Sequence, residues 1–519
     1  GELSCVAAVE AVSQRVQAEN GRINAIVEDL TATARREAES HDEILQKSGP
    51  LGPLHGVPVT IKVNVDQKGH ATTNGVPALK DVIAPDDAPI VSNLKKAGAI
   101  VIGRTNTPEF SFRATTDNPL HGRTLNPWDD MRSPGGSSGG ASAALAAGFG
   151  PIAHGNDIGG SLRFPAFMCG LATIRPTFGR VPAYNPSAPS ERSLLAQMMS
   201  TQGIIAREMR DVRLATKVMS AHDPRDPWQM PVPFDGPPVA QPIKVAVARE
   251  TNGYPIDPAI TAAIDTAAEV LQAAGYVVEE VDPPLLREAA NDALAALFGD
   301  VKLFMGEMVA AMGSATMQEI FRQSYDIFKV FEPIDLLHAM SRRTRYTRAW
   351  NVFAETYPLI LTPFMMRPSY EWDEDTRGGA EVEVGPETGK GALLKLVVSG
   401  DAGKAIHPLV CQGQDEGAAM MGVSQALFET MKYDGTRLTN GTPLTYRAPL
   451  ASDMPPAFWS ITQEQGHGPG PFGAKGMGEG GMLPVASAVA NAIEDAVGVR
   501  LTELPLSPQR VLAALRAKA

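Results

Sequence analysis

The chain has 519 residues, of which 44% are hydrophobic and 20% charged, and its formal net charge is −12. This length predicts two or three domains, because a single hydrophobic core rarely serves more than about 300 residues. The acidic balance argues against a nucleic-acid partner, which needs clustered Lys and Arg, and the lack of an apolar run of about 18 residues argues against a membrane span.

The N-terminal part predicts alternating helices and strands. Apolar residues at helical spacing indicate a helix over 4–19, and a polar helix is expected over 29–46. The stretch "GPLHGVPVTIKVNV" (52–65) predicts a turn and a buried strand that ends near Lys62. The stretch "APIVSNLKKAGAIVIG" (88–103) predicts a helix, a glycine stop and a β-branched strand, which form an α/β unit.

The central part continues this alternation. Prolines concentrate in 223–243, which predicts a linker or a surface loop, and a strand is expected at 243–248. Residues 285–356 are expected to be mostly helical, and 357–363 to form a short apolar strand. The acidic, Gly-rich stretch 371–391 is typical of a connection between domains.

The cysteines are few and far apart. Cys5, Cys169 and Cys411 form no CxxC pair and have no His cluster nearby. A disulfide framework and a structural zinc site are therefore not expected, and a reducing cytoplasmic location is the simplest interpretation.

Two stretches are rich in Gly and Ser, "SPGGSSGGAS" (133–142) and "GNDIGGSLRFPA" (155–166). The first contains a G-x-S-x-G pattern, but no strand precedes it as a nucleophile elbow requires. Further along, 476–481 matches GxGxxG but follows a loop, which argues against dinucleotide binding. Turn formation alone remains an alternative for these glycines and serines.

Read together with their neighbours, these stretches resemble the amidase signature family. The matching segments are "GPLHGVPVTIK" (52–62), "IVIGRTNTPEF" (100–110), "NPLHGRTLNPWD" (118–129), "SPGGSSGGASAALAAG" (133–148), "GNDIGGSLRFPA" (155–166) and "CGLATIRPTFGRVP" (169–182). The resemblance implies an α/β amidase-signature fold over 1–370, a mixed β-sheet core covered by helices on both faces. It places a variable substrate region at about 183–370.

The resemblance also implies a Ser–cis-Ser–Lys triad. Ser161 would be the nucleophile, Ser137 the bridging serine in a cis peptide bond, and Lys62 the base. A serine hydroxyl needs an adjacent base, and a lysine can serve only when neutral, which burial in an apolar strand favours.

The turn around Ser161 is expected to stabilise the oxyanion of amide cleavage. Backbone N–H groups in a tight turn would supply the donors, namely those of Ile158, Gly159 and Gly160. Three side chains are expected to support the turn and the triad: Asp157 and Arg163, paired with each other, and Ser138.

Two positions depart from the family pattern, and the histidines carry no expected chemistry. Asn156 stands where a threonine is common, and Arg175 where a lysine is usual.

His55, His121 and His154 lie in or near the motifs and are interpreted as structural hydrogen-bonding residues.

The C-terminal segment 392–519 resembles the end of molybdenum hydroxylases, the xanthine dehydrogenase and aldehyde oxidase family. The matching segments are 401–418, 422–435, 440–455, "GAKGMGEGG" (473–481) and 489–515. By this resemblance Glu479 would be a base beside molybdenum, and Gln414 would lie near the pterin. The segment covers a small fraction of that family's large subunit, so no cofactor is expected, and Glu479 is interpreted as a loop carboxylate without a role. A small α+β fold is expected here, with a strand at 393–398, a helix at 415–433 and two terminal helices.

The leading hypothesis is a serine amidase that converts a small-molecule amide to an acid and ammonia or an amine through an acyl-enzyme, without metal or cofactor. A molybdopterin-dependent oxidoreductase component and an inactive fusion remnant are the alternatives, and a homodimer is left open. Apolar residues of the variable region favour an apolar or aryl acyl group, with a place in the hydrophobic core as the alternative; they are Tyr184, Leu194, Met198, Met199, Phe321, Phe328 and Phe331.

Overall fold

The computed structural model of the chain describes residues 3–239, 241–251, 254–328, 330–374, 379–442, 445–464 and 468–518. The chain divides into two compact units. Unit 1 comprises Gly1–Gly313 and Phe321–Trp372, and unit 2 comprises Ser314–Ile320 and Asp373–Ala519. None of the helices in the described residues is long and apolar enough to cross a membrane.

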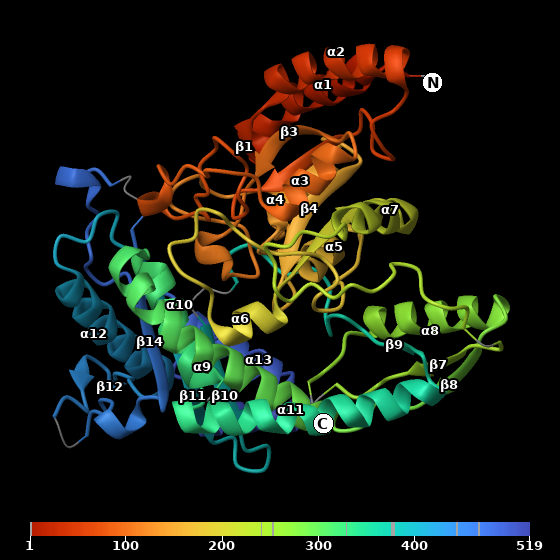
Figure 1. The fold of residues 1–519 in the computed structure, drawn as a ribbon. Helices are drawn as coiled ribbons and strands as arrows, with labels where there is room; N and C mark the ends of the chain where they lie inside the picture. The colour runs from red at the N-terminus through yellow and green to blue at the C-terminus, as the bar shows by residue number, and fades with distance from the viewer. Residues whose placement is uncertain are drawn as a thin grey trace. The chain divides into compact units, whose positions relative to one another are not determined.

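A mixed six-stranded sheet forms the centre of unit 1 (Figure 1). In spatial order its strands are β1 (Ile26–Asp29), β3 (Ile100–Thr105), β2 (Pro58–Lys62), β4 (Ile152–Asp157), β6 (Thr201–Ala206) and β5 (Ala172–Thr173). Strand β2 runs parallel to both β3 and β4, whereas β1 and β6 run antiparallel to their neighbours. The carboxyl ends of β2, β3 and β4 therefore lie at the same edge of the sheet.

Helices cover both faces of this sheet. They are α1 (Cys5–Ile23), α2 (Thr31–Ser48), α3 (Pro89–Lys96), α4 (Gly139–Ala146), α5 (Arg163–Cys169) and α7 (Met209–Met219), whereas α6 (Leu194–Met199) packs against α9 (Leu286–Met312). Short 3-10 turns lie at Pro77–Leu79 and Glu109–Ser111. Helices α1 and α2 pack side by side, with α2 against β3 (Figure 1).

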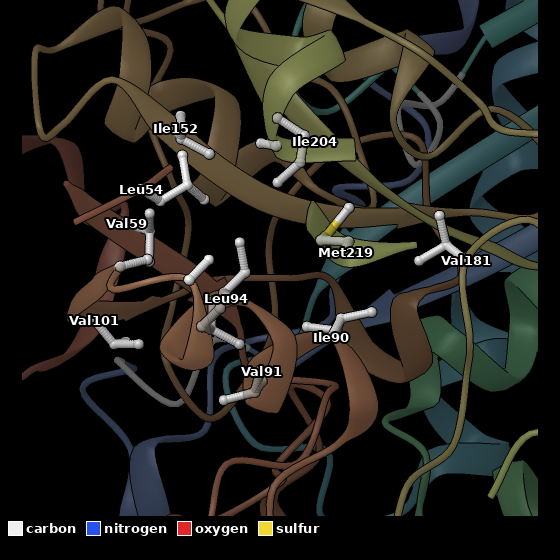
Figure 2. Packing of buried hydrophobic residues seen from close by; sticks show 14 of the residues in the cluster. Leu54, Val59, Ile90, Val91, Leu94, Val101, Ile152, Val181, Ile204 and Met219 are labelled. Atoms are coloured by element: carbon white, nitrogen blue, oxygen red, sulfur yellow. The ribbon is translucent and has the colours of Figure 1, made fainter. Parts of the chain in front are cut away.

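Each face of the central sheet has its own core, because successive side chains along a strand point to opposite faces. Val101 and Ile152 belong to a core cluster with α3 and α7 that also includes Leu94 and Met219 (Figure 2). Ile102, next to Val101 in the chain, instead packs with α1 and α2. All residues of β2, β3 and β6 are buried, as expected for strands covered on both faces.

A second, parallel three-stranded sheet follows in unit 1, in the order β8 (Val277–Glu280), β7 (Lys244–Val247) and β9 (Leu359–Leu361). Its helices are α8 (Pro258–Ala273), α9 (Leu286–Met312) and α11 (Pro333–Thr356), and α10 (Ala315–Ile327) lies between the last two in sequence. The strands expected at 243–248 and 357–363 and the helical stretch over 285–356 are thereby confirmed.

Unit 2 is a small α+β structure. Its sheet has the order β10 (Gly379–Val384), β11 (Gly391–Asp401) and β14 (Ala457–Gln463), with β12 (Tyr433–Asp434) and β13 (Arg437–Leu438) as a separate hairpin. Its helices are α12 (Pro408–Leu427), α13 (Val485–Val497) and α14 (Pro508–Lys518), and short 3-10 turns lie at Ala451–Asp453 and Pro471–Gly473. Leu396, Val423 and Val489 form the centre of its own apolar core.

Several boundaries differ from those expected. The helix expected at 29 begins at Thr31, because the preceding residues form β1, and Asp29 accepts a hydrogen bond from the Thr31 N–H at 2.8 Å. The helix expected at 415–433 begins at Pro408, since proline is well tolerated in a first helical turn. Strand β10 lies within the stretch 371–391, where it pairs with β11.

Candidate active site

The predicted site residues gather at the carboxyl edge of the central sheet. Lys62 is the last residue of β2, and Asp157 is the last residue of the neighbouring parallel strand β4. Ser137 and Ser138 come just before α4, and Ser161 just before α5. In open α/β sheets this edge is the usual place for ligands, because several strands deliver side chains there.

Lys62 is fully buried, and its amine touches three oxygen atoms. Nζ lies 2.6 Å from Ser137 Oγ, 2.8 Å from Asn156 Oδ1 and 3.2 Å from Ser138 Oγ. Burial lowers the pKa of Lys62 well below its ordinary value, and the negative charge of Asp157 opposes this shift only in part. The geometry therefore favours a neutral amine that can accept a proton.

The first Gly-rich stretch lets the backbone around Ser137 pass very close to its neighbours. The peptide bond between Gly136 and Ser137 is cis, as the family resemblance implies. A side chain at Gly136 would place its Cβ 2.4 Å from Arg113 O, and one at Gly140 would lie 2.4 Å from Asn106 N. Thr107 Oγ1 donates to Ser137 O at 2.9 Å, which fixes the carbonyl of this segment. The glycines thus allow the serine pair to reach Lys62.

The turn after β4 is organised by Asp157. Arg163 forms a bidentate pair with its carboxylate, with both N–O distances at 3.0 Å, as expected from the sequence. Arg175 adds a second cation, with Nε 3.4 Å from Asp157 Oδ1. Burial alone would raise the pKa of Asp157, but the Arg163 hydrogen bonds and charge hold it below the ordinary value. Asp157 therefore remains an anion that shapes the turn.

The N–H groups of this turn divide into two sets. The N–H of Gly160, an expected oxyanion donor, instead donates to Asp157 Oδ1 at 2.8 Å. Within the described residues, the N–H groups of Ile158 and Gly159 donate to no protein acceptor. A Cβ at Gly160, whose φ is +123°, would lie 2.4 Å from the ring of Phe164. Gly160 thus shapes the turn, whereas Ile158 and Gly159 keep free donors.

Ser161 lies beside the Lys62–Ser137 pair. The backbone carbonyl of Ser161 accepts a hydrogen bond from the Ser138 N–H at 3.2 Å, and Ser161 and Ser137 line the same cavity. In the described part of the chain, Ser161 Oγ forms no hydrogen bond with Ser137 or Lys62. The structure therefore brings Lys62 and Ser137 into contact and leaves the Ser161 hydroxyl unengaged next to them.

The cavity in front of these residues has a volume of about 1230 Å³. Its apolar wall comes from several segments: Phe110, Phe112, Phe178, Trp228, Leu297, Val301 and Met305. Of the seven apolar residues expected to define the substrate, only Tyr184 lines it. Phe321 instead packs behind Phe112, with ring centroids 4.0 Å apart. Phe110 and Phe112 were not anticipated, although their position just after β3 is the signal that places them at this edge.

The histidines near the motifs have structural partners. His154 is fully buried, and its Nε2 lies 2.9 Å from Gln202 Oε1. Burial lowers the pKa of His154 to about 3 and also lowers the pKa of His121, whose Nε2 lies 3.1 Å from Thr73 Oγ1. His55 Nδ1 accepts from the Leu51 N–H at 3.1 Å. None of the three contacts Ser137 or Ser161 among the described residues.

In unit 2, the two residues singled out by resemblance lie close together. Gln414 Nε2 donates to Gly478 O at 2.7 Å, directly before Glu479, which is exposed. Across the described residues, no group of three or more His, Cys, Asp or Glu side chains is arranged to hold a metal ion.

Comparisons with known proteins match the region that contains this site. The amidase family model matches residues 7–384. An indoleacetamide hydrolase of Bradyrhizobium diazoefficiens is 50% identical over 387 residues, which cover 74% of this chain and 73% of the relative. The solved structure of 6-aminohexanoate cyclic dimer hydrolase is similar with a TM-score of 0.61 and 29% identity, covering 72% of this chain and 78% of that one. A bacterial aryl acylamidase, described as an amidase signature enzyme, has a TM-score of 0.63 and 25% identity, covering 73% and 80%.

Proposed function

The chain belongs to the amidase family, and we propose that it hydrolyses the primary carboxamide of an arylacetic acid with Ser161, Ser137 and Lys62 as catalytic residues. One observation carries this proposal: the buried Lys62 amine lies 2.6 Å from Ser137 Oγ, beside the turn that presents Ser161. A buried amine next to a serine pair is the arrangement that activates a hydroxyl without histidine.

The proposed reaction runs through an acyl-enzyme. Neutral Lys62 takes the proton of Ser137, and Ser137 Oγ takes the proton of Ser161 as Ser161 Oγ attacks the amide carbon. The oxyanion accepts hydrogen bonds from the N–H groups of Ile158 and Gly159, and each such donor contributes about 3 kcal/mol to such a transition state. Collapse breaks the C–N bond, and the proton returns along the same path to give ammonia.

The second half repeats these steps with water. Water gives a proton through Ser137 to Lys62 and attacks the ester carbon. The bond from that carbon to Ser161 Oγ then breaks, the proton returns from Lys62 through Ser137 to Ser161 Oγ, and the carboxylic acid leaves. Ser161 Oγ must turn toward Ser137 for the first step. Among the described residues Ser161 Oγ has no hydrogen-bond partner that would oppose this rotation, and catalytic hydrogen bonds commonly tighten only once substrate is bound.

Two observations support an aryl substrate. The relative that is 50% identical carries the name indoleacetamide hydrolase. The cavity lining includes the aromatic residues Phe112, Phe178 and Trp228, and contact with aromatic rings favours a flat ring over a flexible chain.

A substrate series tests this proposal. Indole-3-acetamide and phenylacetamide are expected to release ammonia with kcat/KM at least about 10-fold above that of hexanamide, because the aromatic wall retains its contacts with a ring. Ammonia release is measured at equal enzyme concentration, with heat-inactivated enzyme as the control. Equal rates for the aryl and aliphatic amides would contradict the substrate class, and no hydrolysis of any of the three would contradict the activity.

Two further proposals concern location and unit 2. We propose a cytoplasmic location, which the three unpaired cysteines support. The similarity of unit 2 to the end of the molybdenum hydroxylases is a proposal about its origin, supported by the contact between Gln414 and the loop that carries Glu479. We propose no chemistry for this unit.

A further inference from the structure

Two side-chain amides form a reciprocal pair next to Lys62. Asn156 Nδ2 donates to Asn64 Oδ1 at 2.9 Å, and Asn64 Nδ2 donates to Asn156 Oδ1 at 3.2 Å. Asn156 belongs to β4, and Asn64 follows β2 by two residues, so the parallel pairing of these strands brings them together. Both are partly buried and line the cavity.

This pairing fixes which end of the Asn156 amide faces Lys62. Asn156 Oδ1 accepts from Lys62 Nζ at 2.8 Å. If the amide were reversed, its NH₂ group would face the N–H groups of Lys62, and the bond to Asn64 Oδ1 would be lost. Asn64 is itself held, because its Nδ2 also donates to Ser111 Oγ at 2.9 Å. The oxygen of Asn156 is thus locked toward the amine.

The contacts around Nζ determine where the lone pair of a neutral Lys62 points. Asn156 Oδ1 carries no proton and can only accept. Ser138 Oγ lies 3.4 Å from Asn156 O, to which it donates, so it accepts from Lys62 at 3.2 Å. A neutral amine has two N–H groups, and these two acceptors use both. The lone pair is left for the remaining neighbour, Ser137 Oγ at 2.6 Å.

We propose that Asn156, oriented by Asn64, is a positioning residue that directs the lone pair of Lys62 at the Ser137 hydroxyl. This inference rests on the proposed role of Lys62 as the base. The same contacts suit the protonated amine, whose third N–H then points at Ser137 Oγ. The proton can therefore pass in both directions without movement of Nζ.

The charged and titratable groups that act on Lys62 are few. Asp157, at the end of β4, raises the pKa of Lys62, but its carboxylate is paired with Arg163 of α5 and with Arg175. His154, also on β4, is fully buried and has a pKa lowered to about 3, so it is neutral near pH 7. A shift of the pH profile caused by a substitution of Asn156 therefore reports a change in the pKa of Lys62.

The test measures how fast a fluorophosphonate probe labels Ser161 in the full-length protein across pH 5–10. The variant Asn156→Leu removes an acceptor that favours the ammonium form, so the pH below which labelling slows is expected to move lower. The maximal rate is expected to fall about 100-fold, because the lone pair is no longer directed. The variant Asn156→Asp adds a negative charge beside Lys62, which favours the ammonium form. The pH below which labelling slows is therefore expected to move higher.

Two further variants complete the experiment. Asn64→Leu leaves Asn156 in place but allows the Asn156 amide to reverse. Like Asn156→Leu, it is expected to lower the maximal labelling rate. Asn93→Leu is the matched control, because Asn93 is a buried asparagine of α3 whose side chain, among the described residues, donates to the backbone carbonyls of Met219 and Ala221. Its pH profile is expected to match that of the wild type.

The outcomes separate this inference from the proposed function. Opposite shifts for Asn156→Leu and Asn156→Asp support the positioning role. Asn156 variants that keep the wild-type pH profile midpoint, a wild-type maximal rate in Asn64→Leu, or the same changes in Asn93→Leu would overturn it and leave the triad intact. A wild-type protein that is not labelled at Ser161 at any pH would overturn the triad and the inference together.

Discussion

Replacing Ser161 with alanine is expected to lower kcat/KM for aryl amides by about 10⁴- to 10⁶-fold, with little change in stability. The proposed chemistry needs an oxygen nucleophile at this position, and the remaining groups can only polarise the carbonyl for attack by water. Because Ser161 Oγ has no hydrogen-bond partner in the described residues, its removal breaks no contact that stabilises the fold. Steady-state ammonia release together with thermal unfolding measures both effects.

A surface serine provides the control for this change. Ser220 Oγ donates to the Lys217 carbonyl at 2.8 Å, near the end of α7, and this is its one bond within the described residues, so Ser220→Ala is expected to retain wild-type activity. Retention of more than about a tenth of the wild-type kcat/KM in Ser161→Ala would rule out Ser161 as the nucleophile.

Replacing Lys62 with methionine is expected to lower kcat/KM by about 10³-fold or more and to change how stability depends on pH. The pKa of Lys62 is lowered in the folded chain, whereas in the unfolded chain it returns to the ordinary lysine value of 10.5. Between these two values the unfolded state binds one more proton, so this residue makes folding more favourable as pH rises. The contribution is fully present above the unfolded pKa and is lost as pH falls toward the folded pKa.

The Lys62→Met variant lacks this pH-dependent contribution to the free energy of unfolding. The difference in unfolding free energy, wild type minus Lys62→Met, is therefore expected to grow as pH rises from 7 to 9, by at most about 1.4 kcal/mol per pH unit. Urea unfolding of both proteins at pH 7, 8 and 9 measures it, and Lys95→Met, in which a partly exposed lysine of α3 is changed, serves as the control. Parallel pH curves for wild type and Lys62→Met would show that Lys62 is charged in the folded protein.

Much of the geometry of the candidate site could be predicted, because it depends on short segments with strong local constraints. Lys62 ends an apolar strand, and burial of the whole strand follows from its composition. Asp157 and Arg163 are six residues apart across one turn, so their pairing could be inferred from sequence. The cis peptide bond before Ser137, which the family resemblance implies, is present, and the glycine that precedes it lies close to residues 113–115.

The features that could not be predicted depend on contacts between distant segments. Asn64 and Asn156 are 92 residues apart and meet only through the pairing of β2 and β4. The cavity wall joins Phe112 with Leu297 from α9, whereas Phe321, an expected wall residue, is almost fully buried behind Phe112. Periodicity identifies an apolar residue as buried but cannot tell a cavity wall from the layer that supports it.

The hydrogen-bond partner of the Gly160 N–H could not be predicted from the sequence either, although it lies only three residues away. The sequence "DIGGS" presents consecutive N–H groups but does not say which of them the Asp157 carboxylate will take. In the structure that carboxylate accepts from the N–H groups of Gly160 and Leu162, at 2.8 and 3.1 Å. The folded turn thus decides that, within the described residues, the N–H groups of Ile158 and Gly159 stay without a protein acceptor.

The central claim is that the hydroxyl of residue 161 forms the covalent bond to the acyl group. The most direct measurement is intact-mass and peptide-mapping mass spectrometry of the full-length protein after reaction with a fluorophosphonate, in which an oxygen–phosphorus bond forms and fluoride leaves. We expect one phosphonyl group per chain on the peptide that contains Ser161, and none on Ser161→Ala. A modification found on Ser137 or Ser138 instead, or one that persists in Ser161→Ala, would contradict the account.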